Sequence, residues 1–193
     1  MVRNRDKVGY YLDSGEIKNI NDDEIRVILR AADELIDTGG RSMLAKILKG
    51  SKDKKLLSFG LEKCPVYGYY QDLTLPAIGH RIDWMIENDY LKIVYNGKLP
   101  VIVFTEIGWE IERETYAAEL LQKLTLLMNG KDYSFVQELT DRNRGLILLL
   151  LEKIRQTQNA GFIPLLKEWQ TLECKKVRRE IEMVINYLIK KDA

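Results

Sequence analysis

The sequence has few of the residues that build catalytic or metal centres. Its 193 residues include two cysteines, Cys64 and Cys174, which lie far apart and form no C-x-x-C pair, and one histidine, His80. Zinc sites and disulfide scaffolds need closely spaced sets of such residues, so we expect neither, and we expect both cysteines to be reduced thiols. His80 has no serine or cysteine partner in its local sequence, which favours a structural histidine over a catalytic one.

Long apolar runs and phosphate-binding loops are also absent. The longest apolar run, residues 145–151, spans seven residues, whereas a membrane helix needs ~20. The first residues, MVRNRDKVGYY, contain no apolar segment typical of signal peptides, so we expect a cytoplasmic protein. No G-x-x-x-x-G-K-[ST] sequence occurs, and the acidic residues form no nuclease or deaminase signature. We therefore predict a protein that is not an enzyme and has no cofactor.

The sequence does contain a core-forming composition with one concentrated patch of positive charge. Hydrophobic residues make up 46% and charged residues 31%, which suits one sizeable domain or two small ones, and the net charge is +1. Between Arg41 and Lys63, however, seven Lys or Arg residues face only two acids. A basic cluster beside a helix N-terminus is a natural phosphate site, so this stretch is the first candidate for a functional surface.

Apolar residues at helical spacing, together with capping residues, predict four helices before residue 90. The first begins after Asn21 and ends at Gly39-Gly40, and the second spans about residues 41–49. The third, capped by Ser51, spans about residues 52–59, and the fourth starts after Thr74. The apolar residues expected inward on the third helix are Leu56, Leu57 and Phe59, and the polar residues expected largely outward on the fourth are His80, Arg81, Asp83 and Glu87.

A β-hairpin is predicted after the fourth helix. Residues 90–95 and 98–105 are rich in β-branched and aromatic residues, and Asn96-Gly97 lies between them. Asn-Gly favours a type I′ turn because both residues can adopt positive φ, so we predict Asn96-Gly97 as the two-residue turn. Helices followed by a twisted hairpin form the winged-helix arrangement, which usually binds nucleic acid. The predicted fold is therefore mainly α with a small β-hairpin.

Three regions are expected along the chain. Residues 1–21 are predicted to form an extended arm that packs Tyr10 and Tyr11 onto the protein. Residues 22–108 are predicted to form the winged-helix domain, and residues 109–193 an all-α C-terminal unit.

In the C-terminal unit, the pattern predicts a helix over about residues 109–128, a strongly apolar helix capped by Asp141, and helices at 162–172 and 174–190. The basic residues Lys175, Lys176, Arg178 and Arg179 lie among the glutamates Glu173, Glu180 and Glu182. A solvated helix face with ion pairs explains them about as well as a second phosphate contact.

Four motifs occur in order along the winged-helix region. They are Gly39-Gly-Arg-Ser-Met with Gly50-Ser51, then Phe59-Gly60, Pro65-Val-Tyr-Gly68, and the helix ending in Ile82-Asp-Trp-Met-Ile-Glu-Asn-Asp-Tyr-Leu. Together they resemble the RQC domain, the winged helix that follows the motor in RecQ-family DNA helicases. The resemblance covers roughly residues 31–111. The whole chain is more similar to small stand-alone bacterial RQC-like proteins than to a helicase.

The resemblance implies phosphate binding after the second helix. RQC domains hold phosphates with a Gly-Ser turn and the basic residues that follow it, and some relatives separate strands with an aromatic residue at the wing tip. Here the turn is short and polar, which favours backbone contact over strand separation. The contacts predicted on this basis are Arg41, Ser51, Lys52, Lys54, Lys55, Tyr67, His80, Arg81, Tyr95, Asn96 and Lys98.

We therefore predict a nucleic-acid-binding protein of low sequence specificity, with duplex or branched DNA as its ligand. RNA or ribosome binding remains an alternative, because a basic winged helix does not distinguish the two polymers. A second alternative is a protein adaptor that uses the C-terminal unit, with a helicase or another protein as partner. No membrane partner is expected.

Overall fold

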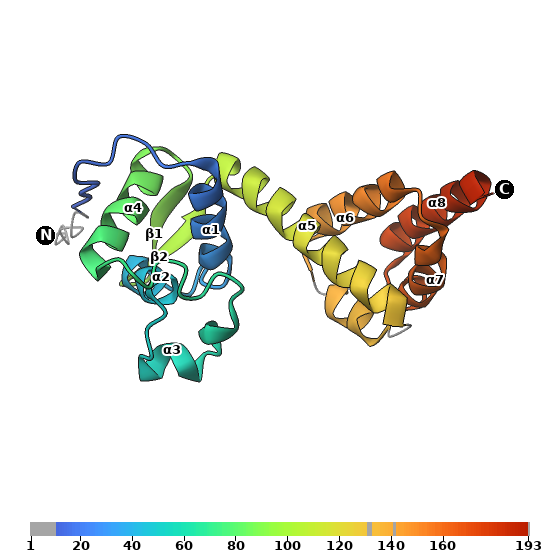
Figure 1. The fold of residues 1–193 in the computed structure, drawn as a ribbon, viewed down its shortest axis with the longest axis horizontal. Coiled ribbons are helices and arrows are strands. Elements are labelled where there is room, and N and C mark those ends of the chain that lie inside the picture. Colours follow the sequence, from blue (N-terminus) through green and yellow to red (C-terminus); the bar gives the residue numbers. More distant parts are fainter. Residues whose placement is uncertain (1–10, 131–132, 141, 193) are drawn as a thin grey trace, which may run out of the picture. The chain divides into compact units, whose positions relative to one another are not determined.

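The computed structural model describes residues 11–130, 133–140 and 142–192. The chain divides into two compact units, Met1–Glu110 and Ile111–Ala193 (Figure 1). Both are largely helical, and the strands in the described residues form one two-stranded antiparallel sheet in the first unit. The predicted fold class is confirmed: mainly α with a small β-hairpin, in a winged helix followed by an all-α unit. Within the described part of the chain, every helix is too short or too polar to cross a bilayer.

The first unit packs its helices around one apolar core. Helix α2 packs against both α1 and α4, and α4 in turn contacts the first strand. The side chains at the centre of this core are fully buried and come from all three helices and the hairpin: Ile28, Leu29, Leu44, Ile47, Leu48, Ile78, Ile82, Met85, Leu91 and Ile102. The elements are α1 (Asp22–Asp33), α2 (Arg41–Lys49), α3 (Lys54–Ser58), the 3-10 turn η1 (Leu61–Lys63), α4 (Leu75–Glu87), β1 (Leu91–Asn96), β2 (Leu99–Phe104) and the start of α5 (Glu106–Gly130).

The wing is confirmed as a hairpin, but its turn lies one residue later than predicted. Asn96 pairs with Leu99, so the two-residue turn is Gly97-Lys98. Gly97 has a φ of 63°, and neither Asn96 nor Lys98 has positive φ. This pattern fits a type II′ turn, which places glycine at its first central position, rather than the predicted type I′ turn at Asn96-Gly97. Asn96 is therefore a strand residue.

Strand β2 is bonded along both of its edges. Besides its pairing with β1, the Ile102 N–H donates to the Gly39 carbonyl (2.9 Å), and the Asp37 N–H donates to the Ile102 carbonyl (3.2 Å). The segment that leads into α2 thus joins the sheet as a third, irregular edge. This explains why α1 ends at Asp33, before the Gly39-Gly40 pair that was expected to end it.

Helix α3 is shorter than predicted and begins from a different cap. The Asp53 carboxylate accepts hydrogen bonds from the N–H groups of Lys55 (2.9 Å) and Leu56 (3.3 Å), which makes Asp53 the N-cap in place of Ser51. A helix of five residues has room for one inward side chain, which is Leu56. Leu57 is 42% exposed and Phe59 is 66% exposed, so the prediction that both point inward is wrong.

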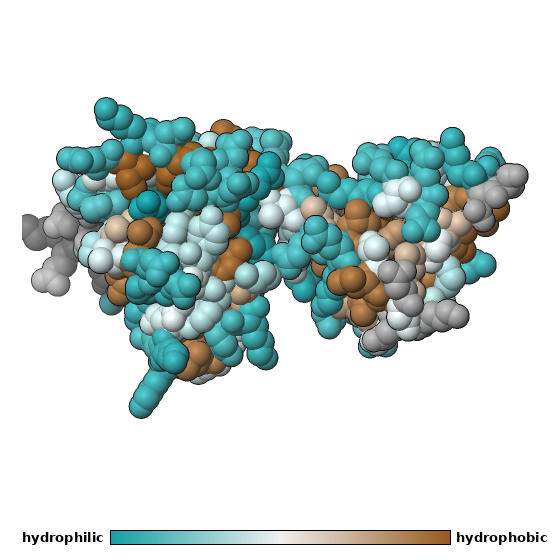
Figure 2. All heavy atoms as spheres, viewed as in Figure 1, coloured by the Kyte–Doolittle hydropathy of each residue, from teal (hydrophilic) through white to brown (hydrophobic). Residues whose placement is uncertain are grey.

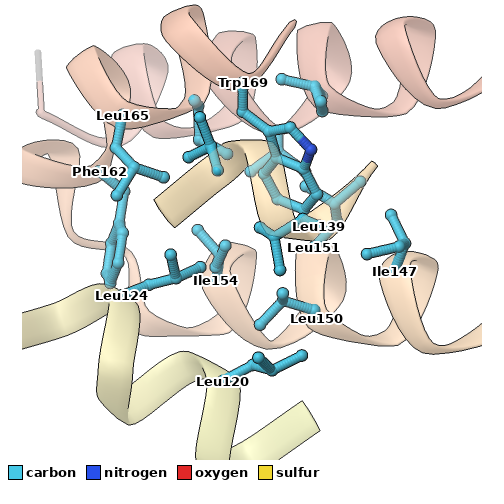
Figure 3. Close-up of a cluster of buried hydrophobic side chains, with 14 of the residues drawn as sticks. Leu120, Leu124, Leu139, Ile147, Leu150, Leu151, Ile154, Phe162, Leu165 and Trp169 are labelled. Carbon is cyan, nitrogen blue, oxygen red and sulfur yellow. The ribbon is translucent and has the colours of Figure 1, made fainter. Parts of the chain in front are cut away.

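The second unit is built on a core of its own. Figure 3 shows side chains from α5, α6 and α7 meeting around the indole of Trp169. Trp169 is fully buried, and its Nε1 donates to the Glu173 carboxylate (2.8 Å). Asn143 caps α6, whereas the predicted cap, Asp141, lies outside the described residues. Besides the rest of α5, the elements are η2 (Ser134–Leu139), α6 (Arg144–Thr157), η3 (Ala160–Phe162), α7 (Ile163–Leu172) and α8 (Lys175–Asp192).

Candidate nucleic-acid interface

The Gly50-Ser51 turn ends α2 and packs on a motif from farther along the chain. Gly50 adopts a left-handed conformation (φ 73°), and the Ser51 N–H donates to the Lys46 carbonyl (3.0 Å). Gly68 also has positive φ (76°), and its N–H donates to the Ile47 carbonyl (3.0 Å). A Cβ on Gly50 would lie 3.0 Å from the Gly68 Cα. The two glycine motifs therefore form a single joint.

Ser51 lies within this joint and not at the helix start. The Tyr67 hydroxyl donates to the Ser51 carbonyl (2.9 Å), and the Asp53 N–H donates to Ser51 Oγ (3.3 Å). Both predicted contacts, Ser51 and Tyr67, therefore hold the turn in shape. The Ser51 hydroxyl remains half-buried beside the start of α3.

The cations on α2 are bound within the protein. The Arg41 guanidinium pairs with the buried Asp83 carboxylate (2.5 Å), Lys46 pairs with Asp53 (2.8 Å), and the Lys49 ammonium donates to the carbonyl of Gln71. The Lys46 ammonium, followed by the N–H groups at the start of α3, holds the pKa of Asp53 below its usual range. These cations stabilise the winged helix.

The lysines after the Gly-Ser turn are placed differently. Lys52, Lys54 and Lys55 are all exposed, and none forms an ion pair with an acid in the described part of the chain. Lys54 and Lys55 form the first turn of α3, directly after the Asp53 cap. Three ammonium groups within four residues make a local site for an anion with several charges, such as a nucleic-acid backbone.

Arg41 also anchors the N-terminal arm. Its guanidinium donates to the Tyr11 carbonyl (3.3 Å), and the Asp13 N–H donates to the second oxygen of Asp83 (3.0 Å). His80 lies 3.6 Å from the Asp13 carboxylate. A cavity of about 380 Å³ lies at this contact, between α2 and α4. Asp83 was predicted to face outward and is 3% exposed, because the arm and α2 both close over it.

The arm itself is only partly as predicted. The side chain of Tyr11 is 83% exposed, so it does not pack on the protein as expected, although its backbone carbonyl does. Tyr10 lies outside the described residues.

Arg81 belongs to a structural network rather than to an open surface. It donates to the Glu24 carboxylate (3.3 Å) and lies over the Tyr70 ring, with its guanidinium carbon 5.3 Å from the ring centre. The Tyr70 hydroxyl donates to the same carboxylate (2.8 Å), and burial together with Glu24 raises the pKa of Tyr70. This network joins α1 to α4.

The wing presents the remaining predicted residues. Asn96 and Lys98 are exposed at the tip, and Tyr95 is exposed by 45% on β1 opposite Pro100. Leu99 next to the turn is 69% exposed. The tip thus combines one cation with an aromatic and an aliphatic side chain.

Sequence patterns missed the exposed apolar residues of α3. A partial clue was available, because Phe59 lies four residues after Lys55 and three after Leu56, so helical spacing places it between the exposed and the buried face. The basic residues at the start of α8 remain open to either interpretation. Lys175, Lys176 and Arg179 are exposed, while Arg178 donates to the Glu173 carbonyl (2.9 Å).

Comparison with known proteins agrees with the sequence motifs. The RQC domain family model matches residues 17–125 of the chain. A curated relative, the ATP-dependent DNA helicase RecQ of Bacillus subtilis (strain 168), is 26% identical over 85 residues, which is 44% of this chain and 14% of the helicase. The chain therefore matches only a small part of that protein. No solved structure matches the chain. The expected RQC resemblance is confirmed and extends beyond residues 31–111 at both ends.

Proposed function

The chain belongs to the RQC domain family, and from this premise we propose that it is a non-catalytic protein that binds DNA through phosphate contacts. The RQC domain of RecQ helicases is a nucleic-acid-binding domain, and the curated relative is a DNA helicase, which favours DNA over RNA. The matched region is the binding domain alone.

The observation that supports this proposal is the group formed by Lys52, Lys54 and Lys55. Their ammonium groups are exposed and have no acidic partner among the described residues, in contrast to the cations on α2. Each lysine that neutralises a phosphate releases a condensed counterion, so affinity depends steeply on salt. Lysine–phosphate contacts carry no sequence information, so low specificity follows.

The test is a titration of labelled single-stranded, duplex and forked DNA, and of matched RNA, at two salt concentrations. Lys52/Lys54/Lys55→Ala is compared with the wild type. Removing three phosphate contacts reduces the slope of log affinity against log salt by about 2.7. At 0.1 M salt, we expect affinity to fall by roughly 100-fold, which corresponds to about 2.7 kcal/mol.

The matched control is Lys167/Lys190/Lys191→Ala, which removes three exposed lysines from the second unit and leaves the basic residues at the start of α8 in place. Its affinity should stay within about 3-fold of the wild type, since it loses the same net charge at another place. The lysine site is wrong if the first triple variant binds every ligand as the wild type does. If no ligand binds more tightly than ~10⁻⁴ M, the protein-adaptor alternative replaces the proposal.

A further inference from the structure

We propose that the exposed ring of Phe59 stacks on an unpaired base of a strand whose phosphates are held by Lys52, Lys54 and Lys55. This inference rests on the proposed function and narrows its ligand. The ligand is then a single strand, or a junction with at least one unstacked base, rather than a closed duplex.

Phe59 is exposed at a fixed position on the backbone. Phe59 is 66% exposed, so the fold does not gain the stabilisation that burying a phenylalanine would provide. Its N–H donates to the Leu56 carbonyl (3.2 Å), and the N–H of Gly60 donates to the Leu57 carbonyl (3.0 Å). Gly60 then reverses the chain with a φ of 70°. The ring is therefore presented by an ordered helix end.

Exposed cationic and apolar side chains are neighbours on this turn. Phe59 keeps near-helical backbone angles (φ −94°, ψ 0°), so Lys55, four residues earlier, lies on the same face. Leu57, 42% exposed, adds apolar surface beside Lys54. In Figure 2, brown and teal residues lie side by side in the part of the first unit where Figure 1 places α3.

The charge around the ring favours a nucleic acid over a protein as the occupant. Lys52, Lys54, Lys55 and Lys63 are all exposed between residues 52 and 63, whereas the two acids of this stretch are less accessible. Asp53 is bound to Lys46 and to the helix start, and Glu62 is half-buried. Cores of protein–protein interfaces are depleted in lysine. Sites for single-stranded nucleic acid combine a positive surface with aromatic rings on which bases stack. A base inside a duplex has no free face for such a ring.

The test compares two labelled strands with equal numbers of phosphates, a short oligothymidylate and an abasic strand of the same length. Base stacking on an aromatic ring predicts that the wild type binds the oligothymidylate about 5- to 100-fold more tightly. Phe59→Ala should abolish this difference while leaving the salt slope unchanged. The matched control is Leu126→Ala, since Leu126 is 73% exposed in the second unit. This control should keep the preference.

Phe59→Trp adds a direct readout. Stacking predicts that the indole fluorescence, measured as a difference from the wild type, is quenched by oligothymidylate and not by the abasic strand. Of the three native tryptophans, Trp84 and Trp169 are buried and Trp109 is half-buried, and subtracting the wild-type signal removes the contribution of all three.

The possible failures are distinguishable. If the wild type prefers oligothymidylate and Phe59→Ala still retains that preference, the inference is overturned while the proposed function stands. If the wild type binds both strands equally, Phe59 makes no base contact and the inference is also overturned. If the wild type binds neither strand, nor any duplex, the proposed function fails together with it.

Discussion

The cations of the basic stretch fall into two groups that look alike in the sequence. Those on α2 (Arg41, Lys46 and Lys49) each bond to an acid or a carbonyl of the protein, whereas Lys52, Lys54 and Lys55 are exposed beyond the turn without an acidic partner in the described residues. The density of positive charge along the sequence does not distinguish the two groups. The difference indicates that one group stabilises the fold and the other is available to a ligand.

The strongest way to test this contrast is to reverse the charge of the second group. Lys52/Lys54/Lys55→Glu should weaken DNA binding by at least about 1,000-fold at 0.1 M salt, because it adds repulsion to the loss of three phosphate contacts. The thermal midpoint should stay within about 2 °C of the wild type, since these side chains are exposed. Fluorescence anisotropy and a circular dichroism melt measure the two effects. A large fall in the thermal midpoint would mean that these lysines also stabilise the fold, which would contradict the proposed difference between the two groups.

Breaking the first group should have the opposite effect. Asp83→Ala leaves the Arg41 guanidinium beside an empty buried site and should lower the free energy of unfolding by about 3 kcal/mol. Folded protein should keep the DNA affinity of the wild type within a few-fold. Urea denaturation checks stability, with Asp72→Ala, an exposed acid, as the control expected to change little. A variant that keeps its stability but loses affinity would show that Arg41 acts on the ligand.

Disrupting the contact between Gly50 and Gly68 should lower the free energy of unfolding by less than Asp83→Ala does. Gly50→Ala should destabilise by about 2 kcal/mol, because it combines left-handed strain with a Cβ only 3.0 Å from the Gly68 Cα. Gly60→Ala is the matched control, with a similar φ of 70° and no atom within 4 Å of the added Cβ. Its cost should be about 1 kcal/mol. Equal costs for the two variants, measured by urea denaturation, would mean that the packing of Gly50 on Gly68 contributes nothing.

Lowering the pH should have the smallest effect of these changes, and it should act on the hydrogen bonds at the start of α3. Lys46 and the first N–H groups of α3 lower the pKa of Asp53 in the folded state. A lowered pKa contributes stability that is complete above the unfolded value, about 3.9, and is lost as pH falls through the folded value. We therefore expect the protection of the Lys55 and Leu56 amides against exchange, relative to the intrinsic rate at each pH, to fall below about pH 4. Asp53→Asn, which does not titrate there, should remove this step, and an unchanged step would assign it to another group.

Local patterns were enough to predict the winged helix, and they failed where two local solutions compete. In the wing, Gly97 suits two different turns. It can take the second central position of a type I′ turn at Asn96-Gly97 or the first central position of a type II′ turn at Gly97-Lys98. The observed choice buries Leu91 and Ile102 and lets β2 bond to Gly39. The choice between the two turns depends on the rest of the fold, because moving the turn by one residue moves every side chain of the hairpin to the other face of the sheet.

Several site residues depended on contacts that no local pattern contains. Asp83 is buried by Arg41, which lies 42 positions away in the sequence, so helical periodicity alone placed it outward. Ser51 and Asp53 are both good N-caps, and Asp53 is selected because Ser51 already belongs to the end of α2. The lysines themselves were predictable, since exposure is the ordinary state of lysine.

The contact between Gly50 and Gly68 has a consequence for modularity. The segment between them, which carries the lysines and Phe59, begins and ends at one point of the fold, and its buried side chains Leu56, Leu61 and Cys64 hold it against the domain. Its length is therefore largely independent of how α2 packs on α4, and doubling a loop costs only about 0.6 kcal/mol in closure entropy. We therefore expect that changes at the exposed positions of this segment alter ligand preference while the winged helix beneath it is kept.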